Sequence, residues 1–393
     1  MFSKANINKF QQLETPFYYY DMEVLRQTLD ACRDASAKHG FHVHYAMKAN
    51  FNPRVLDMIQ SFGFGADCVS GNEVKAAIDH DFDKGKVVFA GVGKSDKEIN
   101  LALDADIFCF NVESVQELNI IDELAGAKNK KANVAIRINP NVDAHTHHFI
   151  TTGLDENKFG INIWQLPDVA AALRKCSNLQ FLGIHFHIGS QITDLEVYKS
   201  LCTRINEMQD WFEDHGFQVK VLNTGGGLGV DYYNPDGNIA DFENYFQVFK
   251  NFLNVKPGQE VHFELGRALV AQSASLISRV LYVKNGLKKN FLILDAGMTE
   301  LIRPMLYQAY HQIENLSQEP ETPATDNPQP ATDKIKYDVV GPICESTDCF
   351  QKDVDLPESF RGDLIAVRTA GAYGEVMASG YNLRDRVGSI YSE

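Results

Sequence analysis

Lys48 is the residue whose setting most directly suggests covalent chemistry. It ends the run His44-Tyr45-Ala46-Met47-Lys48, which alternates like a strand, and the small, polar turn Ala49-Asn50 follows it. A lysine at the carboxyl end of a barrel strand points into the barrel mouth, where active sites of that architecture lie. There, an amine whose neutral form is favoured, or one already held as an imine, can react with an aldehyde. An ordinary solvated lysine at a strand end is the alternative for this segment alone.

Three further segments at or just after strand-like runs carry groups that could bind a ligand: His185–Gln191, Gly225–Gly229 and Glu264–Arg267. In a barrel, the ends of these strands would converge on one face, so that His187 and Ser190 would look into the mouth. The glycines would let backbone N–H groups approach and cradle a phosphate, although a tight turn alone also needs one or two of them. The third segment places a carboxylate, a close-approach glycine and a guanidinium within four residues.

One cofactor would use all of these groups, and it is pyridoxal 5′-phosphate. Its phosphate would take the glycines and Ser190, its aldehyde Lys48, its pyridine nitrogen Glu264, and its ring face the imidazole of His187. The chemistry of this cofactor is an electron sink for a carbanion. A carboxylate beside the ring nitrogen keeps that nitrogen protonated and the sink strong.

Other interpretations exist for individual pieces. His185 and His187 share one face of a strand, as metal ligands do in metal-dependent barrel hydrolases, but such sites need further His and Asp ligands at other strand ends. The cluster His145, His147 and His148 also looks metal-like, yet its threonine-flanked loop favours a polar, structural role. We therefore predict no metal site. Asp67 and Arg137, near strand ends, fit either cofactor partners or members of core ion pairs.

The elements that must position these groups are strands alternating with helical segments, which indicates βαβ units. About eight such units predict a closed parallel (β/α)8 barrel of the TIM type, with an open doubly wound sheet as the alternative. We place this barrel at residues 36–270. The strand-like runs are 42–46, 65–69, 86–90, 107–110, 132–138, 180–186, 218–222 and 260–263.

A second, mostly antiparallel β domain is predicted from residues 1–35 and 271–393, making it discontinuous. After Arg267 the sequence has short, β-branched runs without long helices between them, at 276–283, 291–294, 337–340 and 364–368. Within this domain, residues 317–334 are rich in Pro, Thr, Glu and Asp and cannot bury enough apolar surface to order themselves. We predict that they form a mobile surface insertion.

Composition narrows the class of partner. The chain has 393 residues, and 37 basic against 52 acidic residues give a net charge of -15, which argues against nucleic acid and anionic membranes. It has no secretory h-region and no apolar stretch of about 18 residues, so we expect a cytoplasmic protein. The seven cysteines are scattered without a Cys-x-x-Cys spacing, which is typical of free thiols in a reducing compartment.

The predicted second domain carries three segments that could bind or react. Arg303–Tyr307 offers an anion-binding pair, and Gly371–Gly374 presents a phenol, Tyr373, between glycines. A proline-led, acidic loop presents the thiol of Cys344 beside the carboxylate of Glu345. A free cysteine is more commonly a small buried hydrophobe, and that remains the alternative for Cys344.

Together these segments resemble the alanine-racemase-like, fold type III pyridoxal-phosphate decarboxylases, from about Thr15 to Arg386. Two departures are a leucine at position 265, where the family commonly has proline, and a longer insertion at 317–334. The matching motifs are Tyr45–Asn50, Gly65–Ser70, His145–His147, Thr152-Gly153, Lys158–Gly160, His185–Gln191, Gly225–Gly227, Glu264–Arg267, Arg303–Tyr307, Cys344–Ser346, Tyr373 and Tyr381-Asn382.

The resemblance implies decarboxylation of meso-2,6-diaminopimelate to L-lysine and CO2, the last step of lysine biosynthesis. It implies that Lys48 holds the cofactor covalently, that His187 stacks on its ring and that Cys344 donates a proton. It also implies a head-to-tail homodimer in which the Cys344-Glu345 loop enters the barrel mouth of the other chain. Because the substrate has a second amino-carboxylate end, Arg303 and Glu345 would clamp it there.

The residues and the resemblance together define the candidate site. The candidate cofactor-binding residues are Lys48, Asp67, Arg137, His187, Ser190, Gly225, Gly226, Gly227, Glu264, Gly266, Arg267 and Tyr373. The candidate substrate-binding residues are Arg267, Arg303, Tyr307, Glu345 and Tyr373.

Other functions stay open. A decarboxylase of the same family acting on arginine, ornithine or a carboxy-polyamine is the main one. A regulatory homologue or a cofactor carrier is the non-enzymatic one, although the second domain and the retained lysine and glycines weigh against it.

Overall fold

Eight parallel strands close into a barrel within residues 2–142, 158–317 and 334–393, the part of the chain that the computed structural model describes. The last strand, β9, pairs in parallel with the first, β2, and this pairing closes the sheet. The predicted closed barrel is therefore confirmed over the open doubly wound sheet. The strands are β2 (His42–Ala46), β3 (Gly65–Cys68), β4 (Val87–Phe89), β5 (Cys109–Val112), β6 (Ala132–Arg137), β7 (Leu179–His185), β8 (Val221–Asn223) and β9 (Glu260–Leu265).

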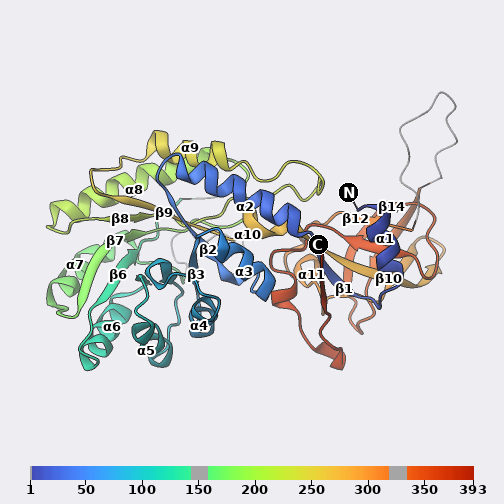
Figure 1. Cartoon of the computed structure of the whole chain (residues 1–393), viewed down its shortest axis with the longest axis horizontal. Coiled ribbons are helices and arrows are strands. Elements are labelled where there is room, and N and C mark those ends of the chain that lie inside the picture. Colours follow the sequence, from blue (N-terminus) through green and yellow to red (C-terminus); the bar gives the residue numbers. More distant parts are fainter. Residues whose placement is uncertain (1, 143–157, 318–333) are drawn as a thin grey trace. The chain divides into compact units, whose positions relative to one another are not determined.

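Helices surround the barrel strands (Figure 1). Several of them start at a serine whose side chain accepts the backbone N–H of a glutamate three residues later, as at Ser70, Ser95 and Ser114. Such caps fix where these helices begin. The helices are α2 (Met22–Ala37), α3 (Pro53–Ser61), α4 (Gly71–Asp79), α5 (Asp96–Ala105), α6 (Val115–Ala127), α7 (Leu166–Lys175), α8 (Glu196–Asp214), α9 (Phe242–Phe252) and α10 (Arg267–Val270).

The remaining strands form a mostly antiparallel sheet, as predicted. Its main order is β12-β15-β10-β11-β13-β14, and β1 pairs with β10 and β16. The parallel pairs in it are β11 with β13 and β1 with β16. The elements are α1 (Lys4–Gln11), β1 (Phe17–Tyr20), β10 (Ala274–Asn285), β11 (Asn290–Leu294), α11 (Arg303–Tyr307), β12 (Ile313–Asn315), β13 (Ile335–Val340), β14 (Cys349–Leu356), β15 (Leu364–Val367) and β16 (Ser389–Tyr391).

The chain packs as two compact units. One comprises Met1–Leu25, Asp231–Asn238 and Val270–Glu393, and the other comprises Arg26–Val230 and Ile239–Leu269. The domain boundaries drawn from the sequence, 36–270 for the barrel, stay a prediction. The histidine cluster at 145–148 and the central part of the 317–334 insertion lie outside the described residues.

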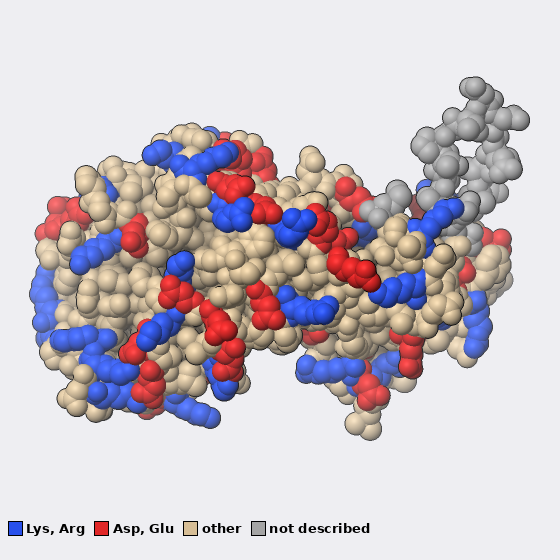
Figure 2. Space-filling view, viewed as in Figure 1, with Lys and Arg blue, Asp and Glu red and all other residues tan. Residues whose placement is uncertain are grey.

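The surface charges, the cysteines and the length of the helices are further features of the described structure. On the face shown in Figure 2, acidic and basic side chains are interspersed over the described residues. Each of the seven cysteines is a free thiol, and most are buried. Among the helices that the structure describes, none combines the length and apolarity needed to cross a bilayer.

Candidate active site

Lys48 lies on a tightly held turn at the carboxyl end of β2. The strand ends at Ala46, and Lys48 sits in the 3₁₀ turn Met47–Ala49. The buried Tyr45 hydroxyl donates to the Asn50 carbonyl at 2.7 Å, which pins the far side of this turn. The Lys48 side chain is 38% exposed, and its Nζ lies 3.9 Å from Oδ2 of Asp67. The lysine is thus neither a solvated surface group nor sealed in the core.

Gly266, after β9, packs against the same turn. A Cβ on Gly266 would lie 3.0 Å from the Cβ of Ala49 and 3.1 Å from the Cβ of Ala46. These distances are tighter than ordinary van der Waals contact, so a larger residue would push against the segment that carries Lys48. The close-approach role predicted for this glycine is therefore also a role in fixing the lysine.

Asp67, in β3, is a buried carboxyl with one unpaired oxygen. Asp67 is 1% exposed, and its Oδ1 has no hydrogen-bond partner among the described residues. Burial and then the negative charge of Glu264 raise the pKa of Asp67 well above its usual range, and the Lys48 ammonium offsets only part of this. A buried polar atom without a partner is costly, so the geometry fits a site where a bound group supplies a donor.

Glu264, near the end of β9, is held by three donors inside the barrel. Its Oε1 accepts the side-chain amides of Asn111 at 2.9 Å and Asn223 at 2.7 Å. Its Oε2 accepts Nε2–H of His185 at 2.9 Å. Burial acts to raise the pKa of Glu264, but its interactions with His185, with His187 and with the Lys48 ammonium outweigh burial, so the pKa is lowered. Glu264 is therefore an oriented, ionised carboxylate.

His187 presents a neutral ring near these charges. Burial first, and then the cations Lys48 and Arg137, hold the pKa of His187 well below its usual range. Its Nδ1 accepts the backbone N–H of Gly226 at 3.3 Å, which leaves Nε2 as the protonated nitrogen. A neutral imidazole has a flat face that can stack on an aromatic ring without charge repulsion.

The glycine segment after β8 is shaped by its backbone neighbours. A Cβ on Gly226 would collide with the Glu264 carbonyl, and one on Gly227 would lie 2.7 Å from the Gly189 carbonyl. Gly227 also has φ +109°, a conformation that favours glycine. Beside it, the buried hydroxyl of Tyr198 has no hydrogen-bond partner within the described part of the chain. Packing against neighbouring strand ends thus requires these glycines, in addition to the predicted access to backbone N–H groups.

Ser190 and Arg267 are joined to each other. Nε and Nη2 of Arg267 donate to Oγ of Ser190 at 3.3 and 3.1 Å. Arg267 starts α10 and is 6% exposed. The two residues follow β7 and β9, so the structure brings together two groups that the sequence placed on the same ligand.

Arg137, at the end of β6, forms a buried ion pair that the sequence analysis left open. Its Nη1 lies 2.7 Å from Oε1 of Glu113, and its guanidinium lies 4.8 Å from the centre of the Phe159 ring. Glu113 also accepts the backbone N–H groups of Gly91 and Gly160 at 3.0 Å. Arg137 is therefore a member of a core ion pair, whatever further role it has.

Sequence reasoning missed the groups that hold Glu264 and Arg137, namely Asn111, Asn223 and Glu113, and it considered His185 only as a metal ligand. One signal was available: Asn111 and Asn223 are polar residues within otherwise apolar strand ends, and a polar residue there is buried only when it has partners.

In the other compact unit, Arg303 is fixed by a histidine of defined tautomer. The Arg368 carbonyl can only accept, so His311 donates Nδ1–H to it at 2.8 Å. The Nε2 of His311 then accepts from Nη1 of Arg303 at 2.8 Å. Arg303 is 5% exposed, lies 4.8 Å from the Tyr232 ring centre, and starts α11, which ends at the half-buried Tyr307.

Cys344 and Glu345 lie on an exposed loop. The N–H of Cys344 donates to Oδ1 of Asn382 at 3.2 Å, and the Tyr381 hydroxyl donates to Oε1 of Glu345 at 2.7 Å. The exposed thiol of Cys344 rules out the buried-hydrophobe alternative. Tyr373 adopts φ +56°, a left-handed conformation that is uncommon outside glycine and is often found at functional positions.

The barrel residues fit pyridoxal phosphate by three observations. Within the described ranges, Oδ1 of Asp67 and the hydroxyl of Tyr198 have no hydrogen-bond partner, and a ligand could supply one to each. Glu264 is ionised, as a partner for a protonated ring nitrogen must be. Lys48 offers a partly exposed amine on a fixed turn.

Comparisons with known proteins point in the same direction. Residues 24–271 match the family model described as pyridoxal-dependent decarboxylase, pyridoxal binding domain. The chain is 56% identical over 381 residues to diaminopimelate decarboxylase of Bacteroides thetaiotaomicron, covering 96% of each chain. It is 38% identical to diaminopimelate decarboxylase of Aquifex aeolicus, covering 98% of this chain and 88% of that one.

A solved structure agrees with these matches. The crystal structure of diaminopimelate decarboxylase from Helicobacter pylori complexed with L-lysine superposes with a TM-score of 0.90 at 38% identity, covering 98% of this chain and 93% of that one. Near-complete coverage at this identity extends the likeness over both compact units. The chain therefore belongs to the diaminopimelate decarboxylases, within the pyridoxal-dependent decarboxylase family.

Proposed function

We propose that this chain decarboxylates meso-2,6-diaminopimelate to L-lysine and CO2, the last step of lysine biosynthesis, with pyridoxal 5′-phosphate as cofactor. The observation that carries the proposal is the ionised Glu264, held by three donors in the same barrel as the fixed Lys48 turn. The diaminopimelate decarboxylase relatives and the lysine-complexed structure support the choice of substrate.

Lys48, Glu264 and His187 would hold the reactive part of the cofactor. When bound, pyridoxal phosphate supplies a sink for the electron pair of the Cα–carboxylate bond as CO2 leaves. Lys48 would hold it through its amine and yield that position to the substrate amine. The Glu264 carboxylate would keep the ring nitrogen protonated, and the neutral His187 would lie flat against the ring.

The phosphate would be held by neutral donors and one cation. We assign it to Gly227, Gly266 and Tyr373, with Gly225, Gly226 and Ser190 completing the contact. Arg267, which already donates to Ser190, would add positive charge. Because the chain has net charge -15, a dianionic group needs such local donors.

The substrate would be held at its far end and protonated at Cα. Arg267, Arg303, Tyr307, Glu345 and Tyr373 are the proposed contacts. Arg303 and Glu345 would engage the distal carboxylate and ammonium, and the hydrogen bond from His311 to the Arg368 carbonyl keeps His311 as an acceptor that orients Arg303.

After CO2 leaves, the exposed thiol of Cys344 would deliver a proton to Cα. This assignment rests on the resemblance and on the exposure of the thiol.

A substrate panel tests the proposed function. Purified protein supplied with pyridoxal phosphate is given meso-2,6-diaminopimelate, arginine, ornithine or a carboxy-polyamine, and CO2 release is measured, with Lys48→Ala as the blank. We expect kcat/KM for diaminopimelate to exceed that for each other substrate by at least about a hundredfold, since a lost charged contact leaves its partner unpaired. Faster CO2 release from arginine or ornithine than from diaminopimelate would contradict the proposal and favour the alternative substrates.

We also propose a cytoplasmic homodimer in which each site draws barrel residues from one chain and the Cys344-Glu345 loop from the other. Mixing Lys48→Ala with Cys344→Ala chains tests this, since random exchange makes half the dimers mixed, each with one intact site. We expect recovery of about a quarter of wild-type activity. If the mixture stays as inactive as its components, the sites are not shared.

A further inference from the structure

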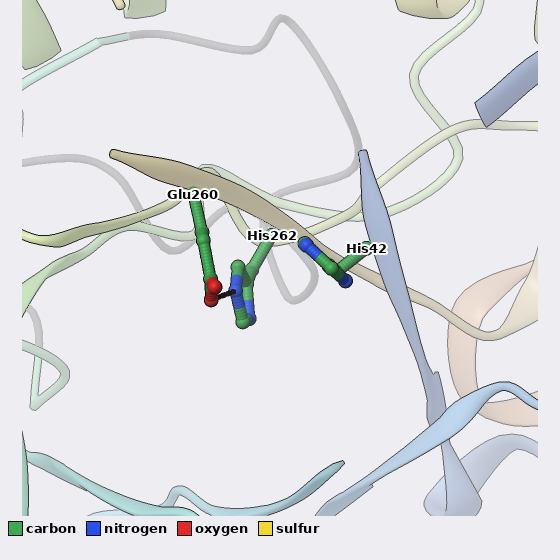
Figure 3. A group of neighbouring side chains, drawn as sticks. All are labelled: His42, Glu260 and His262. Carbon is green, nitrogen blue, oxygen red and sulfur yellow. Dashed lines mark hydrogen bonds and ion pairs between the residues drawn. The ribbon is translucent and has the colours of Figure 1, made fainter. Parts of the chain in front are cut away.

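A second cluster of ligand-type side chains lies at the opposite, amino-terminal end of the barrel strands. His42 opens β2, Glu260 opens β9, and His262 follows two residues later. The two strands pair in parallel with His42 opposite His262, so all three side chains project from one seam (Figure 3). One potential ligand atom from each of the three lies within 4.8 Å of the others.

Hydrogen bonds fix which nitrogen of His262 faces Glu260. The Lys86 carbonyl can only accept, so His44 donates Nδ1–H to it at 2.9 Å. His44 is 2% exposed, and its Nε2 lies 2.8 Å from Nδ1 of His262, which leaves Nε2 of His262 to face Glu260.

The other ring nitrogen of His262 contacts the Glu260 carboxylate. Its Nε2 lies 3.1 Å from Oε2 of Glu260. A metal ion between these two atoms would also be within reach of the nearby ring of His42.

We propose that His42, Glu260 and His262 bind a divalent transition-metal ion of the zinc type, with water completing the coordination. Two imidazoles and a carboxylate are ligands that zinc accepts. His44 would be the positioning residue, because a metal-bound histidine ordinarily donates its other N–H to a fixed acceptor.

The surroundings allow the site to close on an ion. A tetrahedral ion with bonds of about 2.0–2.1 Å needs ligand atoms about 3.3 Å apart, so atoms now within 4.8 Å of one another must approach by up to about 1.5 Å. Glu260 can move, since its side chain is 55% exposed, and His42 is also exposed. A cavity of about 400 Å³ lined by these residues gives access.

The two described Lys and Arg side chains that line this cavity, Arg33 and Lys86, have partners other than Glu260. Arg33 forms ion pairs with Asp30 and Asp34, and the Lys86 ammonium donates to the Gly63 carbonyl. The proposed site would join the first and last strands of the barrel, so an ion bound there would stabilise barrel closure. From the sequence we predict no metal site, and the histidines considered there as ligands lie elsewhere in the chain.

Zinc binding to the cofactor-loaded enzyme tests the proposal. Equilibrium dialysis against Zn²⁺, followed by metal analysis, gives affinity and stoichiometry, and thermal unfolding gives the effect on stability. The variants are His42→Ala and Glu260→Gln, both at exposed side chains, with circular dichroism to verify folding. The matched control is His80→Ala, which removes a histidine paired with Asp57 at 2.6 Å elsewhere on the barrel.

We expect the wild type and His80→Ala to share one zinc-binding event that raises Tm. In His42→Ala and Glu260→Gln, its affinity should fall by about tenfold or more and the rise in Tm should disappear. Equal binding by all four proteins, no binding by the wild type, or equal loss in His80→Ala would each overturn the assignment.

Discussion

Glu264→Gln is the perturbation that most sharply separates the charge of this residue from its shape. Glutamine has nearly the same volume, and its Oε1 can still accept the amides of Asn111 and Asn223. Its Nε2 would meet the Nε2–H of His185, donor against donor. His185 can relieve this by carrying its hydrogen on Nδ1, which has no partner among the described residues. The barrel should therefore fold, with one charge-assisted hydrogen bond lost.

The structure sets the size of both expected effects. Loss of the charge-assisted bond from His185 should cost about 1.5–3 kcal/mol of unfolding free energy. The effect on turnover should be separate, because the glutamine cannot stabilise a proton on the ring nitrogen. Removing one oriented electrostatic partner from a buried site typically lowers kcat by about 10² to 10³.

Three measurements distinguish these effects: urea unfolding, visible absorbance of the bound cofactor, and kcat at saturating diaminopimelate. Glu243→Gln serves as the control, because Glu243 is exposed and forms a surface ion pair with Lys38. We expect Glu264→Gln to bind cofactor and to lose turnover, with the control unchanged. A cofactor-loaded Glu264→Gln enzyme with more than about a third of wild-type kcat would refute the role assigned to the carboxylate.

Three further predictions concern a buried ion pair, a buried carboxyl and a thiol. Glu113→Ala should lower the unfolding free energy by about 3–5 kcal/mol, because it leaves Arg137 buried without its carboxylate, whereas Asp30→Ala at an exposed pair should cost at most about 1 kcal/mol; equal urea midpoints for the two would contradict this. Burial raises the pKa of Asp67, so the folded, cofactor-free protein keeps a proton on this carboxyl that the unfolded chain releases above its ordinary pKa of about 3.9. The unfolding free energy of the wild type therefore falls as the pH rises above that value. Asp67→Asn should therefore gain stability relative to wild type between pH 4 and pH 7 in urea titrations of cofactor-free protein, and a pH-independent difference would argue against it. Cys344→Ala should keep the cofactor spectrum and lose most turnover, and unchanged turnover would remove the thiol from the mechanism.

The barrel was predictable because its strands are buried on both faces and read as apolar runs separated by helical segments. The β2 bounds matched the prediction at His42–Ala46. Elsewhere the ends moved by a few residues: the run at 218–222 became β8, Val221–Asn223. Apolar content shows where a strand is buried, but hydrogen bonding with its neighbours decides where it ends.

Elements with little apolar signal were missed. β14, Cys349–Leu356, is largely polar and half exposed, and β16 has three residues, Ser389–Tyr391. Helix α1, Lys4–Gln11, buries only Phe10. Such segments are held by pairing with distant parts of the chain, which a local pattern cannot register.

Some residues of the candidate site could likewise be predicted from the sequence, whereas their partners could not. Lys48, Glu264 and the glycines were recognisable because strand ends in a barrel share one face. Their partners were not: Asn111, Asn223 and His185 meet Glu264 from three other strands. The seam cluster of His42 and His262 likewise requires knowing that the first and last strands pair.

The central claim is that the Lys48 amine carries the cofactor in the barrel. The most direct measurement is the visible absorbance of purified Lys48→Ala after incubation with pyridoxal phosphate, followed by borohydride reduction and mass analysis of peptides from the wild type. We predict that the lysine-bound absorbance appears in the wild type only and that reduction places the cofactor mass on the peptide containing Lys48. Cofactor mass on a different lysine, or the same absorbance in Lys48→Ala, would contradict the account.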